Sequence, residues 1–462
     1  MYGAEVVRLF GAYKDVWDPA GGMNPGMLVR PARLDENLRF AVLPATPFAG
    51  EVARCVGVAK CRTADTGGGA SVMCPSYRVT GEERHSTRGR ARLLHEMLAG
   101  EIVTDGWRSA EVAEALDLCL GCKGCRSDCP VGVDMAAYKA EFLHRHWAGR
   151  IRPLSHYTLG GLPGWLRLIA GLRAAGAVDA LARRLPVPGL DRDRGGRLPE
   201  LAREPFTRSL PATTAFEARG PGRSPGSVML WPDTFTEYLA PETGRAAVRV
   251  LRAAGLDVGV PRGGTVCCGL TYVSTGRLDR ARKVLRRTLD ALGDVPGPVV
   301  VLEPSCAAAL RTDLPALLPD DPRAARLAAA VRTFAEALEE YAPEWRPPRL
   351  DRAVVGQTHC HQHAVLGDGP DRRLRERAGL VGSSAAAAAG WRATSASSPA
   401  PRGVGGLRGG TAAPVAARGP AGRRDPGGRF SCRTQIEQLG GVRAGTWRNS
   451  CGGVGGRAGG RV

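Results

Sequence analysis

One run of cysteines constrains this chain more than any other feature of its sequence. Cys119, Cys122, Cys125 and Cys129 are separated by two, two and three residues, and Pro130 follows the last of them. This spacing is typical of segments that hold 4Fe-4S clusters, in which the first three thiolates bind one cluster. The fourth cysteine, before proline, binds the other cluster of a two-cluster domain. The run therefore requires a second set of cysteines elsewhere in the chain.

That second set lies upstream at Cys55, Cys61 and Cys74, and the last of these is again followed by proline. Exchange of the fourth ligands between the two halves gives one cluster four thiolates, those of Cys74, Cys119, Cys122 and Cys125. The other cluster then has three, from Cys55, Cys61 and Cys129, because Val58 occupies the position of the missing cysteine. Either a nearby residue or water supplies its fourth ligand, or the site holds a 3Fe-4S cluster.

A structural zinc site is the alternative to iron, because zinc sites also use cysteine pairs two residues apart. Zinc sites rarely use three cysteines at successive gaps of two residues, and they do not require proline after the fourth. We therefore predict iron-sulfur clusters in this region.

The number of cysteines, together with the lack of signal-peptide and membrane patterns, indicates a reducing compartment. The chain has thirteen cysteines, no signal-peptide pattern and no apolar run that approaches the roughly 18 residues of a membrane span. We expect a cytoplasmic protein, in which thiols stay reduced and metal or redox chemistry is favoured over disulfides.

A second group of cysteines falls in the C-terminal half. Cys267 and Cys268 stand together before Gly269, Cys306 follows Pro304-Ser305, and Cys360 lies between His359, His361 and His363. Vicinal cysteines are poor disulfide partners, because their bridge would strain the backbone. They suit a metal cluster or redox thiols, and we predict Cys267, Cys268, Cys306 and Cys360 as further metal ligands. Buried cysteines that act as small apolar side chains are the alternative, and the histidines are candidates for ligand or proton-handling roles.

The net charge of +19 is concentrated at one end of the chain. Residues 381–462 contain twelve arginines but only two acids, Asp425 and Glu437, so this segment accounts for +10 of the +19. Its low complexity predicts disorder. Because the rest of the chain is not unusually basic, we expect no nucleic-acid partner.

Residue patterns predict a mixed fold with five segments. Helical patterns follow residues 88–90 and 130, which predicts an α-helical two-cluster ferredoxin-like domain. Short apolar runs at 228–231 and 299–302 alternate with helical runs at 243–254 and 278–292, which predicts a parallel α/β domain. A second α/β unit begins near residue 353, as in a twofold repeat. The expected segments are residues 1–50, 51–150, 151–226, 227–380 and 381–462, the fourth being a cysteine-rich repeat domain and the last a disordered Arg/Gly-rich tail.

Several stretches together carry a resemblance to a known family. They are Cys55-Val-Gly-Val-Ala-Lys-Cys61-Arg62, Met73-Cys74-Pro75-Ser76-Tyr77, Ser86-Thr87-Arg88-Gly89-Arg90 and the run from Cys119 to Pro130. They resemble the iron-sulfur domain of FAD-linked D-2-hydroxyacid dehydrogenases, which include D-lactate dehydrogenase-like and glycolate oxidase-like enzymes. The valine at position 58 resembles the large single-chain branch of that family. The Cys267-Cys268-Gly269, Pro304-Ser305-Cys306 and His359-Cys360-His361-Gln362-His363 stretches are similar to the cysteine-rich CCG repeats of heterodisulfide reductase and of these same dehydrogenases.

The N-terminal residues extend this resemblance. Lys14-Asp15-Val16-Trp17-Asp18-Pro19 and Met23-Asn24-Pro25-Gly26 are similar to the closing segment of the vanillyl-alcohol-oxidase type flavin domain. The resemblance implies that residues 1–50 are the end of such a domain and that FAD is bound only by the missing upstream part. We therefore expect the chain as given to lack dehydrogenase activity.

The resemblance breaks after about residue 380. The family continues there with Cys-Cys-Gly-Leu-Ala-Gly-Asn-Phe-Gly, and the corresponding DNA read one base out of step gives the Ala-Gly-Trp-Arg-Ala-Thr-Ser of residues 389–395. The family pattern returns at Phe430-Ser431-Cys432 and is lost again near Gly445. We interpret the tail as mostly frame-shifted, so that Cys451 is no ligand.

The resemblance implies a role in electron transfer. Reduced flavin, on an upstream domain or a flavoprotein chain, would pass electrons through two 4Fe-4S clusters to a quinone or protein acceptor. The alternative is a stand-alone heterodisulfide-reductase-like thiol/disulfide oxidoreductase. Residues 151–185 combine apolar and basic side chains, which indicates either an ordinary packing helix or a peripheral contact with the inner face of the cell membrane. No catalytic residue is assigned.

Overall fold

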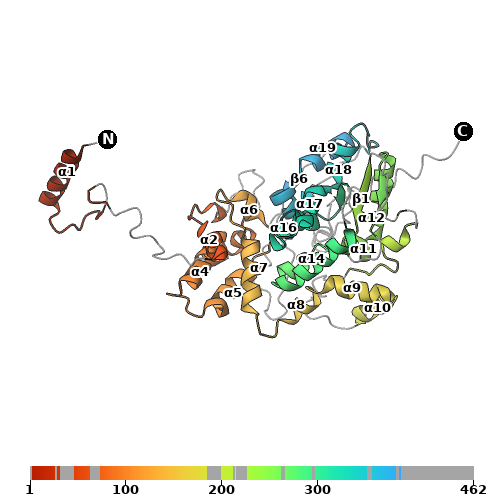
Figure 1. The fold of residues 1–462 in the computed structure, drawn as a ribbon, viewed down its shortest axis with the longest axis horizontal. Coiled ribbons are helices and arrows are strands. Elements are labelled where there is room, and N and C mark those ends of the chain that lie inside the picture. Colours follow the sequence, from red (N-terminus) through yellow and green to blue (C-terminus); the bar gives the residue numbers. More distant parts are fainter. Residues whose placement is uncertain are drawn as a thin grey trace.

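The computed structural model describes residues 3–26, 29–31, 46–62, 73–184, 199–211, 214, 226–261, 266–293, 297–350, 356–380 and 384–386. These residues form a helix-rich molecule with small parallel sheets (Figure 1), as the mixed fold class predicts. The predicted disordered and frame-shifted tail lies outside them from residue 387 on, and so do Cys432 and Cys451.

Residues 46–146, here called the helical region, fold as short helices joined by cysteine-bearing loops. They comprise α2 (Pro47–Ala53), η1 (Lys60–Arg62), α3 (Pro75–Thr80), η2 (Glu83–His85), α4 (Thr87–Ala99), η3 (Gly106–Arg108), α5 (Ala110–Asp117), α6 (Gly124–Asp128) and α7 (Met135–His146). Side chains at the helix starts satisfy backbone donors, since Ser86 accepts from the Gly89 N–H and Ser109 accepts from the Val112 N–H. The helices expected after residues 90 and 130 are present as α4 and α7.

The interior of the helical region mixes aliphatic side chains with cysteines. Leu94, Leu116 and Phe142 are fully buried, and Cys61, Cys74 and Cys125 belong to the same cluster of core residues. One close approach depends on glycine, because a Cβ at Gly89 would lie 2.0 Å from the carbonyl oxygen of Glu83. This approach lets α4 pack directly on η2 and brings the residues after Cys74 close to α4.

Residues 226–350, here called the α/β unit, form a parallel sheet covered by helices. The sheet has the order β2-β1-β3-β4, with β1 (Ser227–Trp231), β2 (Asp257–Gly259), β3 (Val299–Val301) and β4 (Val331–Thr333) all parallel. Its helical elements are α11 (Thr234–Tyr238), α12 (Pro241–Ala253), α13 (Leu270–Ser274), α14 (Leu278–Leu292), α15 (Pro304–Ala308), η6 (Ala309–Asp313), α16 (Leu314–Leu317), α17 (Pro322–Ala330) and α18 (Phe334–Tyr341). The strands and helices expected in this part of the chain are therefore present.

Apolar side chains cover both faces of this sheet, because alternate residues of each strand point to opposite sides. Leu230 and Val300 belong to one core cluster with Leu251 of α12, whereas Trp231 belongs to another with Leu289 of α14. The α/β unit thus has two aliphatic cores of its own.

A short segment follows the α/β unit and carries the His359–His363 stretch. It contains β5 (Gly356–Thr358), η7 (Gln362–Leu366), α19 (Gly369–Arg377) and β6 (Ser384–Ala386), and β5 pairs with β6 in parallel. Strand β5 lies close to the expected start of the second unit near residue 353, but residues 351–355 lie outside the described part of the chain, and the twofold repeat stays a prediction.

Connecting helices run between the helical region and the α/β unit. They are α8 (Leu154–Thr158), α9 (Leu162–Gly171) and α10 (Ala175–Arg184), which follow the lower edge of the molecule in Figure 1, and a turn, η4 (Thr207–Ser209), precedes β1. The N-terminal helix α1 (Ala4–Trp17) stands apart from the rest in the same view. No helix among the described residues is both long and apolar enough to span a bilayer.

Candidate functional site

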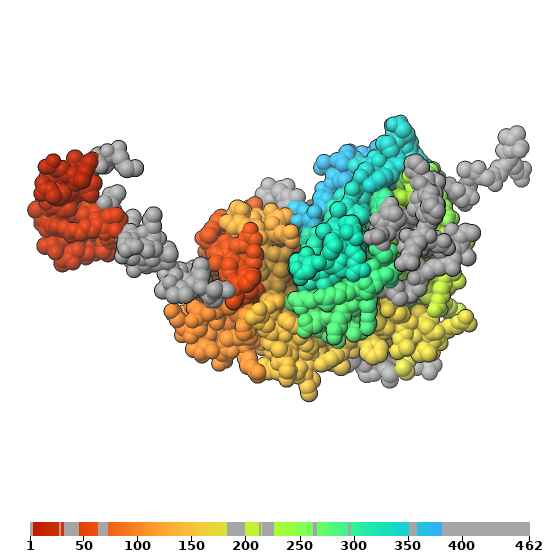
Figure 2. All heavy atoms as spheres, viewed as in Figure 1, coloured from red at the N-terminus to blue at the C-terminus, as the bar shows by residue number. Residues whose placement is uncertain are grey.

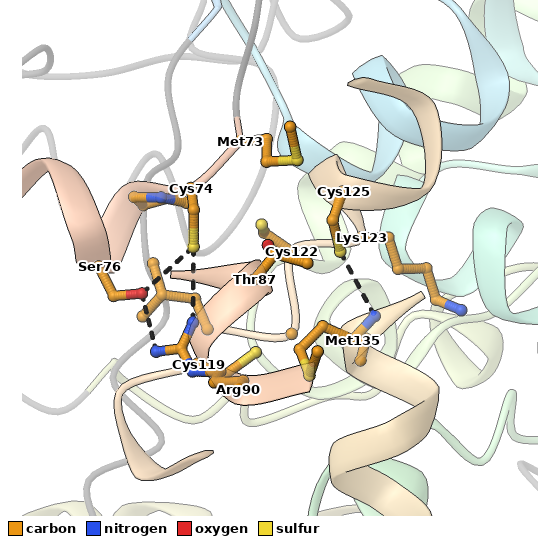
Figure 3. A pocket seen from close by; sticks show the side chains of 14 residues that line it. Met73, Cys74, Ser76, Thr87, Arg90, Cys119, Cys122, Lys123, Cys125 and Met135 are labelled. Atoms are coloured by element: carbon orange, nitrogen blue, oxygen red, sulfur yellow. Dashed lines mark hydrogen bonds between the residues drawn. The ribbon is translucent and has the colours of Figure 1, made fainter. Parts of the chain in front are cut away.

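The four cysteines of the first predicted cluster line one hollow. Cys74 lies before α3, Cys119 and Cys122 lie between α5 and α6, and Cys125 is in the first turn of α6. Figure 3 shows their sulfur atoms arranged around a common space. The space between the lining residues, including its part that is open to solvent, is about 330 Å³. Cysteines from two distant stretches are thus brought together as the crossed motif predicts.

A buried arginine holds one side of this hollow. Arg90 of α4 is 1% exposed, and its guanidinium donates to Cys74 Sγ at 3.5 Å, to Ser76 Oγ at 2.9 Å and to the Ala115 carbonyl at 2.7 Å. Burial favours the neutral thiol of Cys74, but the charge of Arg90 and a hydrogen bond with Ser76 outweigh it and lower the pKa of Cys74. The thiolate is the form that binds metal.

Cys122 and Cys125 need a nearby positive charge if their thiols are to lose their protons. Burial, followed by the proximity of Cys360 and Cys119, raises the pKa of Cys122 well above its ordinary value. Burial and the neighbouring Cys122 do the same to the pKa of Cys125, whose sulfur accepts the Met135 N–H at 3.4 Å. Several thiolates can share this space when a bound metal centre compensates their charge. The donor set therefore fits an iron-sulfur cluster, and N–H···S contacts of this kind tune cluster potentials.

A second hollow of similar size, about 300 Å³, is lined by Cys55, Cys61 and Cys129. Val58 lines it as well, where the crossed motif lacks its fourth cysteine. The Arg88 N–H donates to Cys61 Sγ at 3.3 Å. No further cysteine of the described part of the chain lines this hollow, so its fourth ligand stays open.

The two hollows are adjacent. Met73 and Thr87 line both of them, so the spaces are separated by little more than two side chains. Within the described residues, no three His, Cys, Asp or Glu side chains are gathered closely enough to hold a single metal ion. Zinc would need its sulfur ligands gathered at about 2.3 Å from one point. The iron and zinc content of the purified chain distinguishes the two kinds of site.

The structure brings together three of the four cysteines of the C-terminal group. Cys267, Cys268 and Cys306 are all buried, and the Cys268 thiol donates to Cys306 Sγ at 3.0 Å. The backbone of Cys267 is held by α14, since its N–H donates to Thr288 Oγ1 at 3.0 Å. Cys360 lies close enough to Cys122 to raise its pKa. The prediction that these four residues bind metal stays a prediction.

The cysteine loop of the helical region is docked on the C-terminal part of the chain. Lys123 Nζ lies 2.6 Å from Asp313 Oδ1, and both side chains are largely buried. His361 Nε2 lies 2.9 Å from the Gly121 carbonyl, and His363 Nε2 lies 2.9 Å from Asp128 Oδ1. Figure 2 shows the residues around 120–130 packed directly against those around 360–380. His361 and His363 thus join two regions, and their predicted ligand or proton-handling roles stay untested.

A second contact joins the same two regions. Arg152 donates to the carbonyls of Thr275 and Gly276 at 2.9 and 3.1 Å. A Cβ at Gly276 would lie 2.4 Å from Leu143 Cβ, so α7 approaches this loop only at glycine. The helical region therefore contacts the α/β unit at its cysteine loop and at α7, and Arg152, which follows α7, adds a contact with the same loop of the α/β unit.

Sequence reasoning missed several polar residues that shape this site. Arg90 and Asp128 fall inside the motifs quoted for the family resemblance, so their place in the sequence offered a signal. Asp313 offered none, because nothing in its local sequence links it to a lysine 190 positions earlier. Pairings of this kind become visible only in the fold.

Two family comparisons match the chain. Residues 51–133 match the family described as "4Fe-4S dicluster domain", and residues 233–311 match the family described as "Cysteine-rich domain". The predicted resemblance to the iron-sulfur and CCG portion of these dehydrogenases is confirmed.

Curated relatives agree with these matches. A D-2-hydroxyglutarate dehydrogenase from Pseudomonas putida is 26% identical over 51% of this chain and 28% of its own length. A probable glycolate oxidase iron-sulfur subunit from Bacillus subtilis is 24% identical over 63% of this chain and 69% of its own length. The glycolate oxidase iron-sulfur subunit of Escherichia coli is 28% identical over 48% of this chain and 50% of its own length. The chain spans only 28% of the length of the Pseudomonas putida dehydrogenase and 18% of that of a D-2-hydroxyglutarate dehydrogenase from Haemophilus influenzae. No solved structure matches the chain.

Proposed function

We propose that this chain is the iron-sulfur electron-transfer part of an FAD-dependent D-2-hydroxyacid dehydrogenase, acting on D-lactate, glycolate or D-2-hydroxyglutarate. One observation carries the proposal: cysteines from both half-motifs line each of two adjacent hollows. When bound there, 4Fe-4S clusters accept and donate single electrons. The similarity to oxidase subunits and dehydrogenases supports the same role.

The chain's own residues would bind and insulate the clusters. Cys74, Cys119, Cys122 and Cys125 would hold one cluster, and Cys55, Cys61 and Cys129 would hold the other. Arg90 would compensate negative charge on the Cys74 side, and backbone N–H groups would donate to the sulfurs of Cys61 and Cys125. The Met73 and Thr87 side chains would separate the two sites by a distance short enough for electron transfer.

Iron analysis of the full chain tests this assignment. After anaerobic reconstitution we expect about seven or eight irons per chain and two cluster signals by EPR. Cys122→Ser should remove one signal and Cys61→Ser the other. Ser127→Ala, which changes a neighbouring hydroxyl but no predicted ligand, is the matched control and should keep both. Fewer than about five irons, or stoichiometric zinc, would contradict the proposal.

A flavoprotein is the proposed electron donor. Helix α1 exposes a series of large apolar side chains, namely Val6, Val7, Leu9, Phe10, Tyr13, Val16 and Trp17. Such a face favours burial against a partner, which supports an FAD-binding domain or chain at this end. We expect dye reduction with the three hydroxyacids only when the flavin domain is supplied. Oxidation of any of these hydroxyacids by residues 1–462 without bound flavin would contradict the proposal that a separate flavin domain supplies the electrons.

A membrane surface is a further proposed partner, next to the quinone or protein acceptor. Ile151, Leu154, Leu168 and Leu172 of the connecting segment are exposed, and Arg150 and Arg173 lie beside them in the sequence. This combination supports a peripheral contact with anionic lipid, from the cytoplasmic side. The full chain should co-sediment with phosphatidylserine-containing vesicles at low salt, whereas Leu168→Glu with Leu172→Glu should not. Full recovery of the unsubstituted chain in the supernatant would reject the contact.

The alternative function is a stand-alone heterodisulfide-reductase-like oxidoreductase. The pairing of Cys268 with Cys306 is the observation that favours it. Reduction of an added disulfide substrate by the chain without a flavoprotein would support this alternative.

A further inference from the structure

The hollow around Cys122 and the hollow around Cys61 differ in the cations that lie beside them. Arg90 lines the Cys122 hollow and is 1% exposed. Its guanidinium donates to Cys74 Sγ and Ser76 Oγ, as Figure 3 shows, and to one backbone carbonyl. None of these acceptors is a carboxylate. Because a guanidinium is not deprotonated in proteins, the wall of this hollow carries a permanent and buried positive charge.

A second cation of the Cys122 hollow is compensated. Lys123 also lines this hollow, but its Nζ lies 2.6 Å from Asp313 Oδ1 and 3.5 Å from Asp134 Oδ2. The two carboxylates oppose the charge of the ammonium group at any distance beyond the cluster of three. Arg90 is therefore the cation whose field acts on the interior of the hollow.

The cations of the Cys61 hollow are closer to water. Arg88 and Lys60 line it, and Lys60 is exposed. The Arg88 side chain is 33% exposed, and its Nε lies 2.7 Å from Glu83 Oε1. A pair of charges interacts about four times more strongly at an effective dielectric constant of about 20 than in bulk water. The charge of Arg90 therefore acts on its surroundings more strongly than those of Arg88 and Lys60.

We propose that Arg90 is a positioning residue that selectively raises the reduction potential of the cluster in the Cys122 hollow. The inference rests on the electron-transfer function proposed above. Each electron that a cluster gains makes it one unit more negative, so a fixed positive charge nearby stabilises the reduced form more than the oxidised form. The electron gained at this site is one that the other site gives up. Arg90 thus shifts the share of electrons from the Cys61 hollow to the Cys122 hollow.

The direction of this shift suits the packing of the molecule. The lining of the Cys122 hollow includes Gly121 and Lys123. Their partners His361 and Asp313 lie in the C-terminal part of the chain. The other hollow is lined instead by the loop that follows α2. An electron held in the Cys122 hollow therefore lies at the boundary with the C-terminal part of the chain.

A redox titration of the iron-loaded full chain, followed by EPR, tests the proposal. The two signals are assigned by their loss in Cys122→Ser and Cys61→Ser. The measured quantity is the ratio of reduced cluster in the Cys122 hollow to reduced cluster in the Cys61 hollow. Arg90→Met removes the charge and should lower this ratio at least about tenfold, which is a shift of about 59 mV for a one-electron couple. Arg90→Lys keeps a positive charge and should retain most of the ratio.

Two other arginines of α4 provide matched controls. Arg92 lies on the same helix, is 44% exposed and forms an ion pair with Glu96, so Arg92→Met should leave the ratio unchanged. Arg88→Met removes a charge from the Cys61 hollow and should change the ratio less than Arg90→Met and in the opposite direction. The iron content of each variant is measured in the same samples.

Three results would overturn the proposal. The first is an unchanged ratio in Arg90→Met. The second is an equal fall in Arg90→Lys, which would assign the effect to hydrogen-bond geometry rather than to charge. The third is loss of the Cys122 signal in both Arg90 variants, which would make Arg90 necessary for cluster assembly. An unsubstituted chain that binds no cluster would instead contradict the electron-transfer function, so the two failures are distinguishable.

Discussion

The helical region and the α/β unit differ in what fills their interiors. The α/β unit buries aliphatic side chains on both faces of a four-stranded sheet; the core on one face contains no cysteine, and the core on the other includes Cys268 and Cys306. The helical region places Cys61, Cys74 and Cys125 within its only large core cluster among the described residues, next to two hollows. Its helices are also short, and helices of this length gain little stability on their own. We therefore expect the aliphatic core to stabilise the α/β unit and the clusters bound by the cysteines to stabilise the helical region.

The largest expected effect follows iron removal. Chelation of iron from the full chain should abolish hydrogen-exchange protection in α4 and α7, because the hollows would lose the atoms that link their walls. Protection in β1 and β3 should be retained, since the core on one face of their sheet contains no cysteine. Mass spectrometry of exchanged peptides measures both regions in one sample. Equal protection of α4 before and after chelation would remove the basis of the comparison.

A core truncation in the α/β unit should have the opposite selectivity. Leu230→Ala removes a fully buried side chain of β1 and should lower the free energy of unfolding of the α/β unit by about 2–5 kcal/mol. Iron content should be unchanged. Leu168→Ala, at an exposed position, is the control and should cost little. The measurement is urea unfolding followed by circular dichroism, and a simultaneous loss of iron would show that the two regions are not independent.

The contact between the regions should contribute less. Asp313→Asn leaves the buried Lys123 ammonium without its closest carboxylate, which should cost about 1–3 kcal/mol. We expect the transitions of the two regions, followed by cluster absorbance and by circular dichroism, to separate further along the urea axis. Asp290→Asn removes a comparable but exposed partner of Arg323 and should leave both transitions in place. An effect of Asp290→Asn as large as that of Asp313→Asn would argue against a specific docking contact.

Two helix caps provide the smallest and most symmetrical test. Ser109 caps α5 in the helical region, and Thr333 caps α18 in the α/β unit through a capping box with Glu336. Substitution of either by alanine should cost about 1 kcal/mol in the iron-loaded chain. After iron removal only Thr333→Ala should still lower stability, because α5 would already be unfolded. A persistent effect of Ser109→Ala in the iron-free chain would show residual structure there.

The spacing of the cysteines predicted which cysteines line each hollow. The reason is that cluster ligands recur at short, fixed intervals. The proline after Cys74 and Cys129 marks the cysteine of each half-motif that binds the cluster of the other half-motif. The sheet was predictable for a similar reason, because runs such as Val299–Val301 are apolar and short and alternate with helical patterns.

The remaining parts depend on contacts between distant segments. The pairing of Cys268 with Cys306 was not predicted, because the sequence draws attention to the vicinal pair and gives no register between the two loops. The docking of Lys123 on Asp313 was missed for the same reason. The histidines beside Cys360 were predicted as ligands or proton carriers, and nothing in their local pattern indicated that two of them reach the cysteine loop.

Asp128 has a consequence for how this protein tolerates change in length. One of its carboxylate oxygens accepts the Met73 N–H at 2.9 Å, and the other lies 2.9 Å from His363 Nε2. The residue next to Cys74 is thus held by a side chain 55 positions downstream. On the other side of residues 63–72, Arg62 is held by an ion pair with Glu83. Cys61 and Cys74 therefore each lie next to a residue that is held by a side chain distant in the sequence, so the positions of the two cysteines do not depend on each other through the backbone alone.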